Sequence, residues 1–299
     1  MSPSRRALFQ IHFCVLLWGC TAILGRLITL EALPLVWWRM GLVCSLLLLV
    51  PRVWRGLRAL TPRLWLAYAT VGVVLALHWY TFYGAIKLAN ASVAATCLAL
   101  GPFFLAFVEP LIARRPFRRR ELILGLAVIP GVALVMGGLS TQMRLGLAVG
   151  ALSALLCAIF SALNKRFVEH ADALSVTCVE MGTGALFLTL VLLALPSAGG
   201  PRFPVPSSHD AALLGVLVVA CTLVPFVLAL VALRHLSAFT SQLVVNLEPV
   251  YAVVLAIPFL AEQRELGVSF YLGVAIILAA VFAHREGTPT PPPESGATA

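Results

Sequence analysis

Charged side chains inside long apolar stretches are the residues of this chain best able to do chemistry. Glu248 and Pro249 stand together near the middle of one such stretch, residues 234–262. Proline lacks an amide hydrogen and interrupts helical hydrogen bonding, and the pair falls near the midplane of a hydrocarbon core about 30 Å thick. We expect Glu248 either to bind a proton or a cationic group, or to pair with buried groups that hold the kink.

Arg39 is a second charge within an apolar stretch. An arginine at the bilayer centre costs about 2.5–3.5 kcal/mol on insertion scales, so Arg39 needs a partner, a wet cavity or access to the interface. One interpretation is that it faces a cavity and binds a substrate carboxylate through its planar guanidinium. The other, which the adjacent Trp37 and Trp38 favour, is that it snorkels outward through an aromatic belt.

Glu180 is a third charge of this kind. An ionisable residue within a membrane segment is a candidate functional group by default, because its burial is costly. We expect Glu180 to be either a carboxylate of an inner gate or a structural group that snorkels or pairs with Lys165 or Arg166.

His78 lies in an aromatic run that includes Trp79 and Tyr83. Histidine can change its charge near neutral pH, and the aromatic side chains are suited to an apolar or aromatic ligand. These residues are expected either to line a cavity or to form a packing layer around a satisfied core histidine.

Gln242 and Asn246 are four residues apart and share one helix face, so they can supply hydrogen bonds to a cavity or between helices. Trp18 is expected to cap the cavity or to fill volume. The six histidines are scattered, and the seven cysteines lie in apolar stretches without a CxxC pair. This spacing predicts no metal site, no cofactor and no catalytic residue.

The surrounding chain is that of a membrane protein. Of its 299 residues 61% are hydrophobic and 11% are charged, whereas a soluble chain has about a quarter charged. The composition predicts an all-α polytopic membrane protein with ten transmembrane helices. The expected spans are residues 7–28, 33–51, 64–86, 90–112, 121–138, 145–164, 173–195, 211–233, 237–260 and 266–283.

Lys and Arg residues are distributed unequally between alternate loops. Fifteen of the 21 fall on the side of the N-terminus, five fall on the other side, and Arg39 lies within a span. By the positive-inside rule both termini are cytoplasmic. The net charge of +9 is therefore an orientation signal, and we expect the lipid bilayer rather than nucleic acid as the large partner.

The sequence contains an internal repeat. Shifting the chain by 147 positions brings Lys87 onto Arg234 and Pro102 onto Pro249, and both prolines are expected to break a helix. A five-span unit repeated once would be inverted, as in secondary transporters. We expect a first five-helix repeat in residues 1–143, a second, inverted one in 144–285, and a disordered cytoplasmic tail in 286–299.

These features resemble the EamA-like branch of the drug/metabolite transporter superfamily. The resemblance is carried by Trp18-Gly19, by residues 81–104 and 232–256, and by the segment from Glu262 to Gly273. It implies a secondary active transporter of the bacterial cytoplasmic (inner) membrane that exports amino acids or related small metabolites by alternating access. Members of this family are often driven by the proton gradient, so protons are a candidate coupling ion. We expect a monomer or a homodimer.

Two other classes of function stay open from the sequence. One is a membrane-embedded enzyme that uses Glu248 and His78, and the other is a structural membrane protein without transport activity. Neither a nucleophile–base motif nor a phosphate-binding loop is visible, which disfavours the enzyme. A structural protein would leave the charges within the membrane without a purpose.

Overall fold

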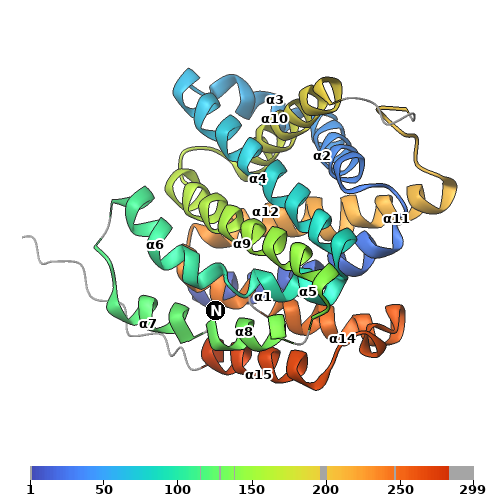
Figure 1. The fold of residues 1–299 in the computed structure, drawn as a ribbon. Helices are drawn as coiled ribbons and strands as arrows, with labels where there is room; N and C mark the ends of the chain where they lie inside the picture. The colour runs from blue at the N-terminus through green and yellow to red at the C-terminus, as the bar shows by residue number, and fades with distance from the viewer. Residues whose placement is uncertain are drawn as a thin grey trace, which may run out of the picture.

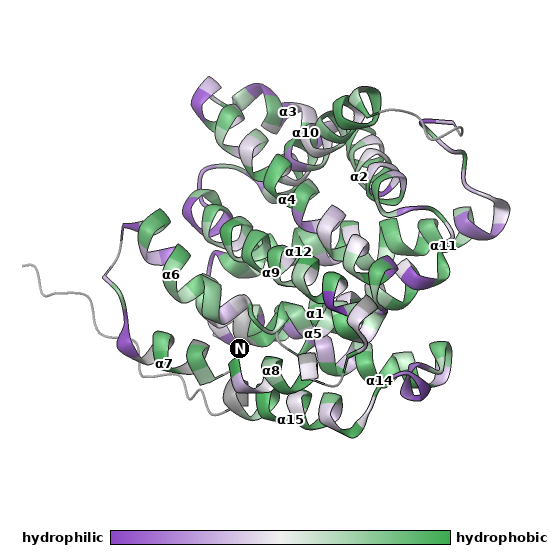
Figure 2. Cartoon of the chain, in the orientation of Figure 1, coloured by the Kyte–Doolittle hydropathy of each residue, from purple (hydrophilic) through white to green (hydrophobic). Residues whose placement is uncertain are grey.

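The computed structural model describes residues 2–114, 116–127, 129–137, 139–195, 201–245 and 247–282, and the regular elements in these ranges are helices (Figure 1). Hydrophobic residues dominate the helices, whereas hydrophilic residues gather at their ends and in the connections (Figure 2). In chain order the elements are α1 (Pro3–Leu27), α2 (Ala32–Leu48), α3 (Pro51–Ala59), α4 (Pro62–Leu88), α5 (Ala91–Leu98), α6 (Gly101–Ala113), α7 (Arg119–Ala127), α8 (Ile129–Gly137), α9 (Thr141–Phe167), α10 (Ala173–Ala194), α11 (Ser208–Val218), the π-helical turn η1 (Val219–Leu223), α12 (Val224–Leu233), α13 (Ala238–Val245), α14 (Glu248–Leu260), the 3₁₀ turn η2 (Glu262–Arg264) and α15 (Val268–Phe282).

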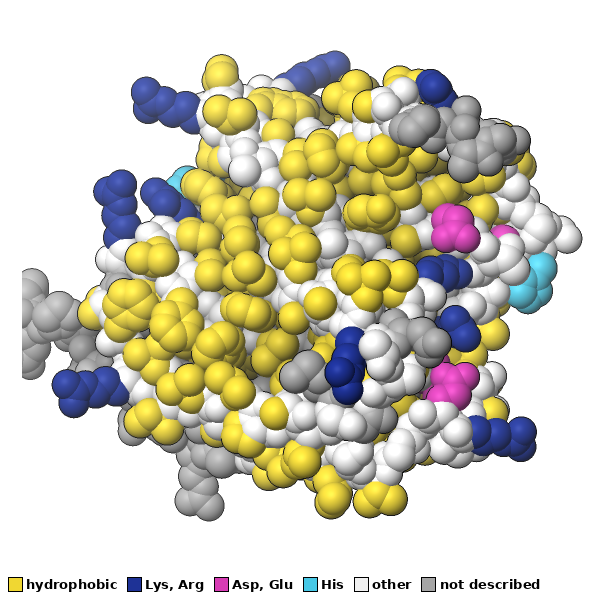
Figure 3. Space-filling model, viewed as in Figure 1, with side chains coloured by type: hydrophobic (Ala, Val, Ile, Leu, Met, Phe, Trp, Pro, Cys, Tyr) yellow, Lys and Arg dark blue, Asp and Glu magenta, His cyan; other side chains and the backbone are white. Residues whose placement is uncertain are grey.

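The surface of the molecule fits a hydrocarbon environment. Hydrophobic side chains cover most of the face in Figure 3, and many of the Lys and Arg side chains project at its margins. Six segments are long and apolar enough to cross a membrane, or seven if the bent pair α2–α3 is one span. The protein is therefore an all-helical membrane protein.

Fewer helices are long and apolar enough to cross a membrane than the ten that the sequence predicts. Two of the expected spans appear as pairs of short helices, α7 with α8 and α13 with α14, and a third, α15, is itself short. The segments that pass are Pro3–Leu27, Pro62–Leu88, Ala91–Ala113, Met143–Phe167, Ala173–Ala194 and Ser208–Leu233.

The basic segment after α2 is a helix, and the prediction of a loop there is wrong. Pro51 has no amide hydrogen with which to continue α2, but its fixed φ suits the first position of a new helix. α3 therefore starts at Pro51 and turns by 96° from α2. Its position is held by Val53, which is fully buried and whose carbonyl accepts a hydrogen bond from the Ser175 hydroxyl at 3.3 Å.

One local structure occurs twice. Each bound of α13 and α14 lies 147 residues after the corresponding bound of α5 and α6. Pro102 and Pro249 each stand in the first turn of the second helix of their pair, directly after the point where the first helix ends. Arg114 and Ala261, which follow the two pairs, have left-handed φ values of 52° and 55°.

Glycines let α9 approach α4 and α5 closely. A Cβ on Gly150 would lie 2.6 Å from the Cys97 Sγ, and one on Gly146 would lie 2.7 Å from the Ala89 Cβ. Both distances are too short for a real contact, so these positions require the absence of a side chain. The glycine spacing thus serves packing within the chain.

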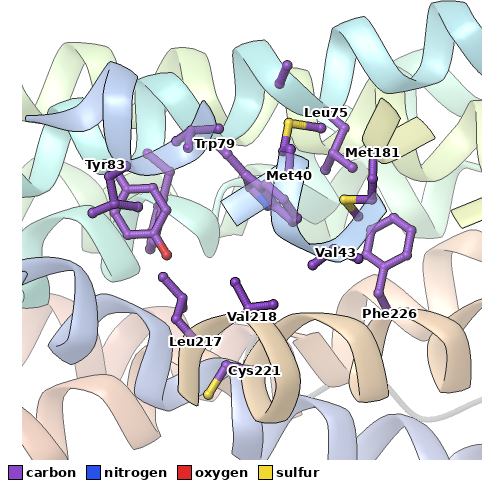
Figure 4. Close-up of a cluster of buried hydrophobic side chains, with 14 of the residues drawn as sticks. Met40, Val43, Leu75, Trp79, Tyr83, Met181, Leu217, Val218, Cys221 and Phe226 are labelled. Carbon is purple, nitrogen blue, oxygen red and sulfur yellow. The ribbon is translucent and has the colours of Figure 1, made fainter. Parts of the chain in front are cut away.

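The main core lies where α2, α4, α10 and the segment from α11 to α12 meet (Figure 4). Most of its buried side chains are hydrophobic, but the buried carboxyl group of Glu180 on α10 also lies in this region. Labelled members are Met40, Val43, Leu75, Trp79, Tyr83, Met181, Leu217, Val218, Cys221 and Phe226.

Glu262 fastens the end of α14 to the start of α5. Its buried carboxylate accepts hydrogen bonds from the Ala91 amide at 3.0 Å, the Ser92 amide at 2.9 Å and the Ser92 hydroxyl at 2.6 Å. A carboxylate at a helix N-terminus satisfies unpaired amides and interacts favourably with the helix dipole. Sequence reasoning used Glu262 only as part of a motif and missed this role.

Candidate substrate-binding cavity

A cavity of about 100 Å³ lies between helices near the centre of the molecule. Its lining comes from both halves of the chain, because α1, α2, α4 and α9 contribute to it together with α12 and α14. Charged and titratable lining residues are Arg39, His78 and Glu248. Aromatic lining residues are Trp18, Trp79, Phe82, Phe160 and Phe226.

Arg39 is held rigidly at the wall of this cavity. Its side chain is 2% exposed. Its Nε donates to the Thr222 hydroxyl at 2.7 Å, and one terminal nitrogen donates to the Tyr83 hydroxyl at 2.9 Å. The guanidinium carbon also lies 3.7 Å from the centre of the Trp79 ring, which is a cation–π contact. These contacts fix the plane of the guanidinium before any ligand arrives.

Pro225 explains why the neighbouring turn η1 offers Arg39 hydrogen-bond acceptors. Pro225 has no amide hydrogen, so the Cys221 carbonyl four residues earlier loses its helical donor. The chain passes through the π-helical turn η1 at this point. The freed Cys221 carbonyl lies 3.4 Å from a terminal nitrogen of Arg39, and the same turn presents the Thr222 hydroxyl.

The interpretation of Arg39 as a snorkelling residue is wrong. The neighbouring indoles make their own contacts instead of guiding it outward. Trp37 donates to the Thr189 hydroxyl at 2.7 Å, and Trp38 donates to the Pro204 carbonyl at 2.8 Å. Arg39 instead contacts Thr222 on η1 and Tyr83 and the Trp79 ring on α4.

Glu248 is the first residue of α14 and lines the same cavity. It is 6% exposed and is close enough to Arg39 for the two charges to interact. A negative charge in the first turn of a helix is favoured by the helix dipole. The break before Pro249 therefore sets a carboxylate at a helix start, opposite a fixed guanidinium.

The other predicted cavity residues have different surroundings. His78 lines the cavity, and its Nδ1 lies 2.9 Å from both the carbonyl and the hydroxyl oxygen of Ser153. Trp18 and Trp79 also line it. Tyr83 does not belong to the lining: it is fully buried and supports Arg39 from behind.

Glu180 does not line this cavity. It is 0% exposed, so the expectation that it snorkels is wrong. It is close enough to Asn164 to interact, but neither side chain has a hydrogen-bond partner of good geometry among the described residues. Lys165 and Arg166 donate to the carbonyls of Leu233 and Ile112, so the structure does not show them as its partners.

Two of the predicted residues lie outside what the structure describes. Asn246 lies outside the described residues, as does the predicted tail 286–299, and the side chain of Gln242 is also not described. Sequence reasoning in turn missed Thr222 and Ser153. A threonine three residues before a proline in an apolar stretch was the available signal for Thr222, whereas Ser153 carried none.

Metal ligation finds no support in the part of the chain that the structure describes. No group of three or more His, Cys, Asp or Glu side chains is positioned there to hold an ion. The seven cysteines are free, and the closest described pair, Cys44 and Cys178, has its sulfur atoms 3.9 Å apart. The chemistry that the cavity offers is hydrogen bonding and charge pairing.

These features define an integral membrane protein with a buried, charged cavity between its helices. The model of the EamA-like transporter family matches residues 5–137 and again 144–284, and the chain belongs to this family. The resemblance seen in the sequence is thus confirmed, and the two matches suggest an internal repeat. Membership in this family, whose members are generally transporters and not enzymes, suggests transport.

No curated protein matches the chain. A solved structure titled "Crystal structure of protein" has a similar fold, with a TM-score of 0.66 and 14% sequence identity. The similarity covers 93% of this chain and 95% of that one.

Proposed function

We propose that this protein is a secondary active transporter that exports amino acids or related small metabolites by alternating access. The observation that carries the proposal is that Arg39 and Glu248 line one buried cavity. A guanidinium binds a carboxylate well, and a carboxylate binds an ammonium group. A cavity with both is complementary to a zwitterion.

The same pair supports coupling to protons. Two opposite charges removed from water are stable only while each is well paired. An amino acid that enters between them pairs its carboxylate with Arg39 and its ammonium group with Glu248. In the empty cavity Glu248 is stabilised either by the charge of Arg39 or by binding a proton. Competition between proton and substrate for one carboxylate is a sufficient basis for exchange of the two across the membrane.

We further propose ten spans in two inverted halves, residues 1–143 and 144–285, with both termini in the cytoplasm of a bacterial cell. The equal spacing of the α5–α6 and α13–α14 bounds supports the repeat. The excess of Lys and Arg on one side supports the orientation. Inverted halves of similar structure can exchange conformations at similar energy, which lets one cavity open to either side.

The test is transport by the full chain reconstituted in proteoliposomes. A thermal-shift screen against amino acids first identifies a stabilising substrate, because a ligand stabilises the state that it binds. In Glu248→Gln we expect flux of that substrate driven by a pH gradient to fall by about 100-fold or more, since the amide cannot exchange a proton at neutral pH.

The matched control is Glu265→Gln, which changes an exposed carboxylate of the same type outside the cavity. It should leave the flux and its pH dependence within about twofold of the unaltered protein. Unchanged flux and unchanged pH dependence in Glu248→Gln would remove the coupling role of Glu248.

A further inference from the structure

A second chamber of about 80 Å³ adjoins the central cavity. The two spaces share lining residues, among them Trp18, Phe160 and Ser161. The second chamber extends toward the ends of α9 and α12, since Asn164 and Leu233 line it. On the proposed orientation this is the cytoplasmic side, from which an exported substrate arrives.

Two polar side chains of this chamber, Asn164 and Ser241, make no side-chain hydrogen bond of good geometry to the described residues. Both side-chain atoms of Asn164, Nδ2 and Oδ1, are buried without a hydrogen bond to the described residues, and so is the Ser241 hydroxyl. Asn164 is 2% exposed and Ser241 is 8% exposed. Leaving buried polar groups unpaired is costly, so native proteins satisfy them with protein, water or a ligand. The chamber is thus built to receive a hydrogen-bonding group.

The group it receives is uncharged. None of the described residues that line the chamber carries a charge, and most of them are aromatic or aliphatic. Glu180 lies near Asn164 but does not belong to the lining. A charged group would stay unpaired here, whereas an amide or hydroxyl can both donate to and accept from the Asn164 amide.

The length of the space favours an amide at the end of a side chain. Cys157 lines the central cavity near Glu248, and Asn164 follows it by seven residues on α9. That separation is about 10 Å at 1.5 Å per residue. Hydrogen bonds at both ends take up about 2.9 Å each. A ligand therefore bridges the two chambers if its hydrogen-bonding tip is several bonds from its charged end.

We propose that the second chamber is a side-chain subsite that selects amino acids with an uncharged, amide-bearing side chain, and that Asn164 and Ser241 read the amide. The inference rests on the proposed function, because Arg39 and Glu248 must hold the charged ends of the same molecule. Glutamine is the preferred ligand and asparagine is too short to pair fully. Leucine offers Asn164 no hydrogen bond, and lysine offers no acceptor to the Asn164 Nδ2 and brings a charge that no lining residue neutralises.

The test is ligand-induced thermal stabilisation of the purified full chain, titrated with glutamine, asparagine, leucine, lysine and glutamate. In the unaltered protein we expect glutamine to bind at least about tenfold more tightly than leucine. Asn164→Leu should abolish this preference and leave leucine binding equal or tighter. Ser241→Ala should reduce the preference for glutamine over leucine in part. If Asn164→Leu does not fold, the Ser241→Ala result tests the subsite. Ser45→Ala, an exposed serine of α2, should change nothing.

The outcomes separate this inference from the proposed function. If amino acids bind but the glutamine-to-leucine ratio is the same in Asn164→Leu and Ser241→Ala as in the unaltered protein, the subsite is wrong and the transporter stands. If no amino acid stabilises the unaltered protein, both proposals are wrong. Preferential binding of lysine or glutamate would also overturn the subsite.

Discussion

Four contacts hold the Arg39 guanidinium in a fixed orientation. Thr222, Tyr83, the Cys221 carbonyl and the Trp79 ring hold the guanidinium from different directions. A fork of donors that is fixed in advance loses less conformational entropy when it binds a carboxylate. Preorganisation at this residue is what we expect to distinguish a binding site from a buried structural charge.

Replacing Arg39 tests this preorganisation. Arg39→Lys keeps the charge but lacks the planar fork, so it cannot reach Thr222 and Tyr83 together. We expect ligands with a carboxylate to bind about 10–100-fold more weakly, while amines that lack a carboxylate change much less. Arg39→Ala should show the same selectivity with a larger loss. Binding titrations on purified protein measure it, and equal losses for both ligand types would rule out the carboxylate clamp.

Short elements determine how the long helices are connected. α3 turns the chain sharply after α2, and the η1 turn before Pro225 presents Thr222 to Arg39. At the end of α14 the Glu262 carboxylate caps α5 and joins the two halves of the chain. α3 has nine residues and η1 has five, yet each contributes to a contact between helices that are distant in sequence.

The Glu262 cap should contribute measurably to stability. Glu262→Ala leaves the Ala91 and Ser92 amides without this acceptor, and we expect the unfolding free energy to fall by about 2–4 kcal/mol. Glu262→Gln keeps one acceptor oxygen and should lose about half as much. Thermal unfolding in detergent is the measurement. Glu169→Gln, an exposed glutamate between α9 and α10, is the matched control, and a Glu262→Ala protein as stable as that control would contradict the capping role.

The whole molecule combines an apolar exterior with a charged interior. Its surface offers hydrocarbon side chains to the lipid, while Arg39 and Glu248 line one buried cavity. Buried charges of this kind need compensating partners, and Arg39 has them in Thr222, Tyr83 and the Cys221 carbonyl. The orientation of this body in the membrane depends on the basic residues at its ends.

Labelling of single cysteines tests the orientation in intact cells. In a chain whose native cysteines are replaced by serine or alanine, Arg202→Cys should react with a membrane-impermeant maleimide added outside. Arg55→Cys, on α3, should react only after the membrane is permeabilised, because the positive-inside rule assigns it to the cytoplasm. The reverse pattern would show that the termini are outside.

The class of the protein, its helix breaks and two of its candidate residues could be predicted from single residues and their immediate neighbours. Hydropathy identified a helical membrane protein, and the missing amide of proline located the breaks at Pro102 and Pro249. Glu248 and Arg39 were recognised as candidates because a charge within an apolar stretch is costly. Each of these inferences depends on a property that a residue or its immediate neighbours carry by themselves.

The contacts of each candidate residue, such as Arg39, could not be predicted from the sequence, because they depend on how the helices pack. In a membrane helix the lipid-facing and the core-facing side chains are both apolar, so periodicity does not say which face turns inward. For that reason the sequence favoured a snorkelling Arg39, whereas the packed helices turn it toward Thr222 and the cavity. The sequence alone determined the class of the protein and its helix breaks, because these follow from local chemistry. Only the packing of distant helices decided that Arg39 and Glu248 share one cavity, since that depends on which faces meet.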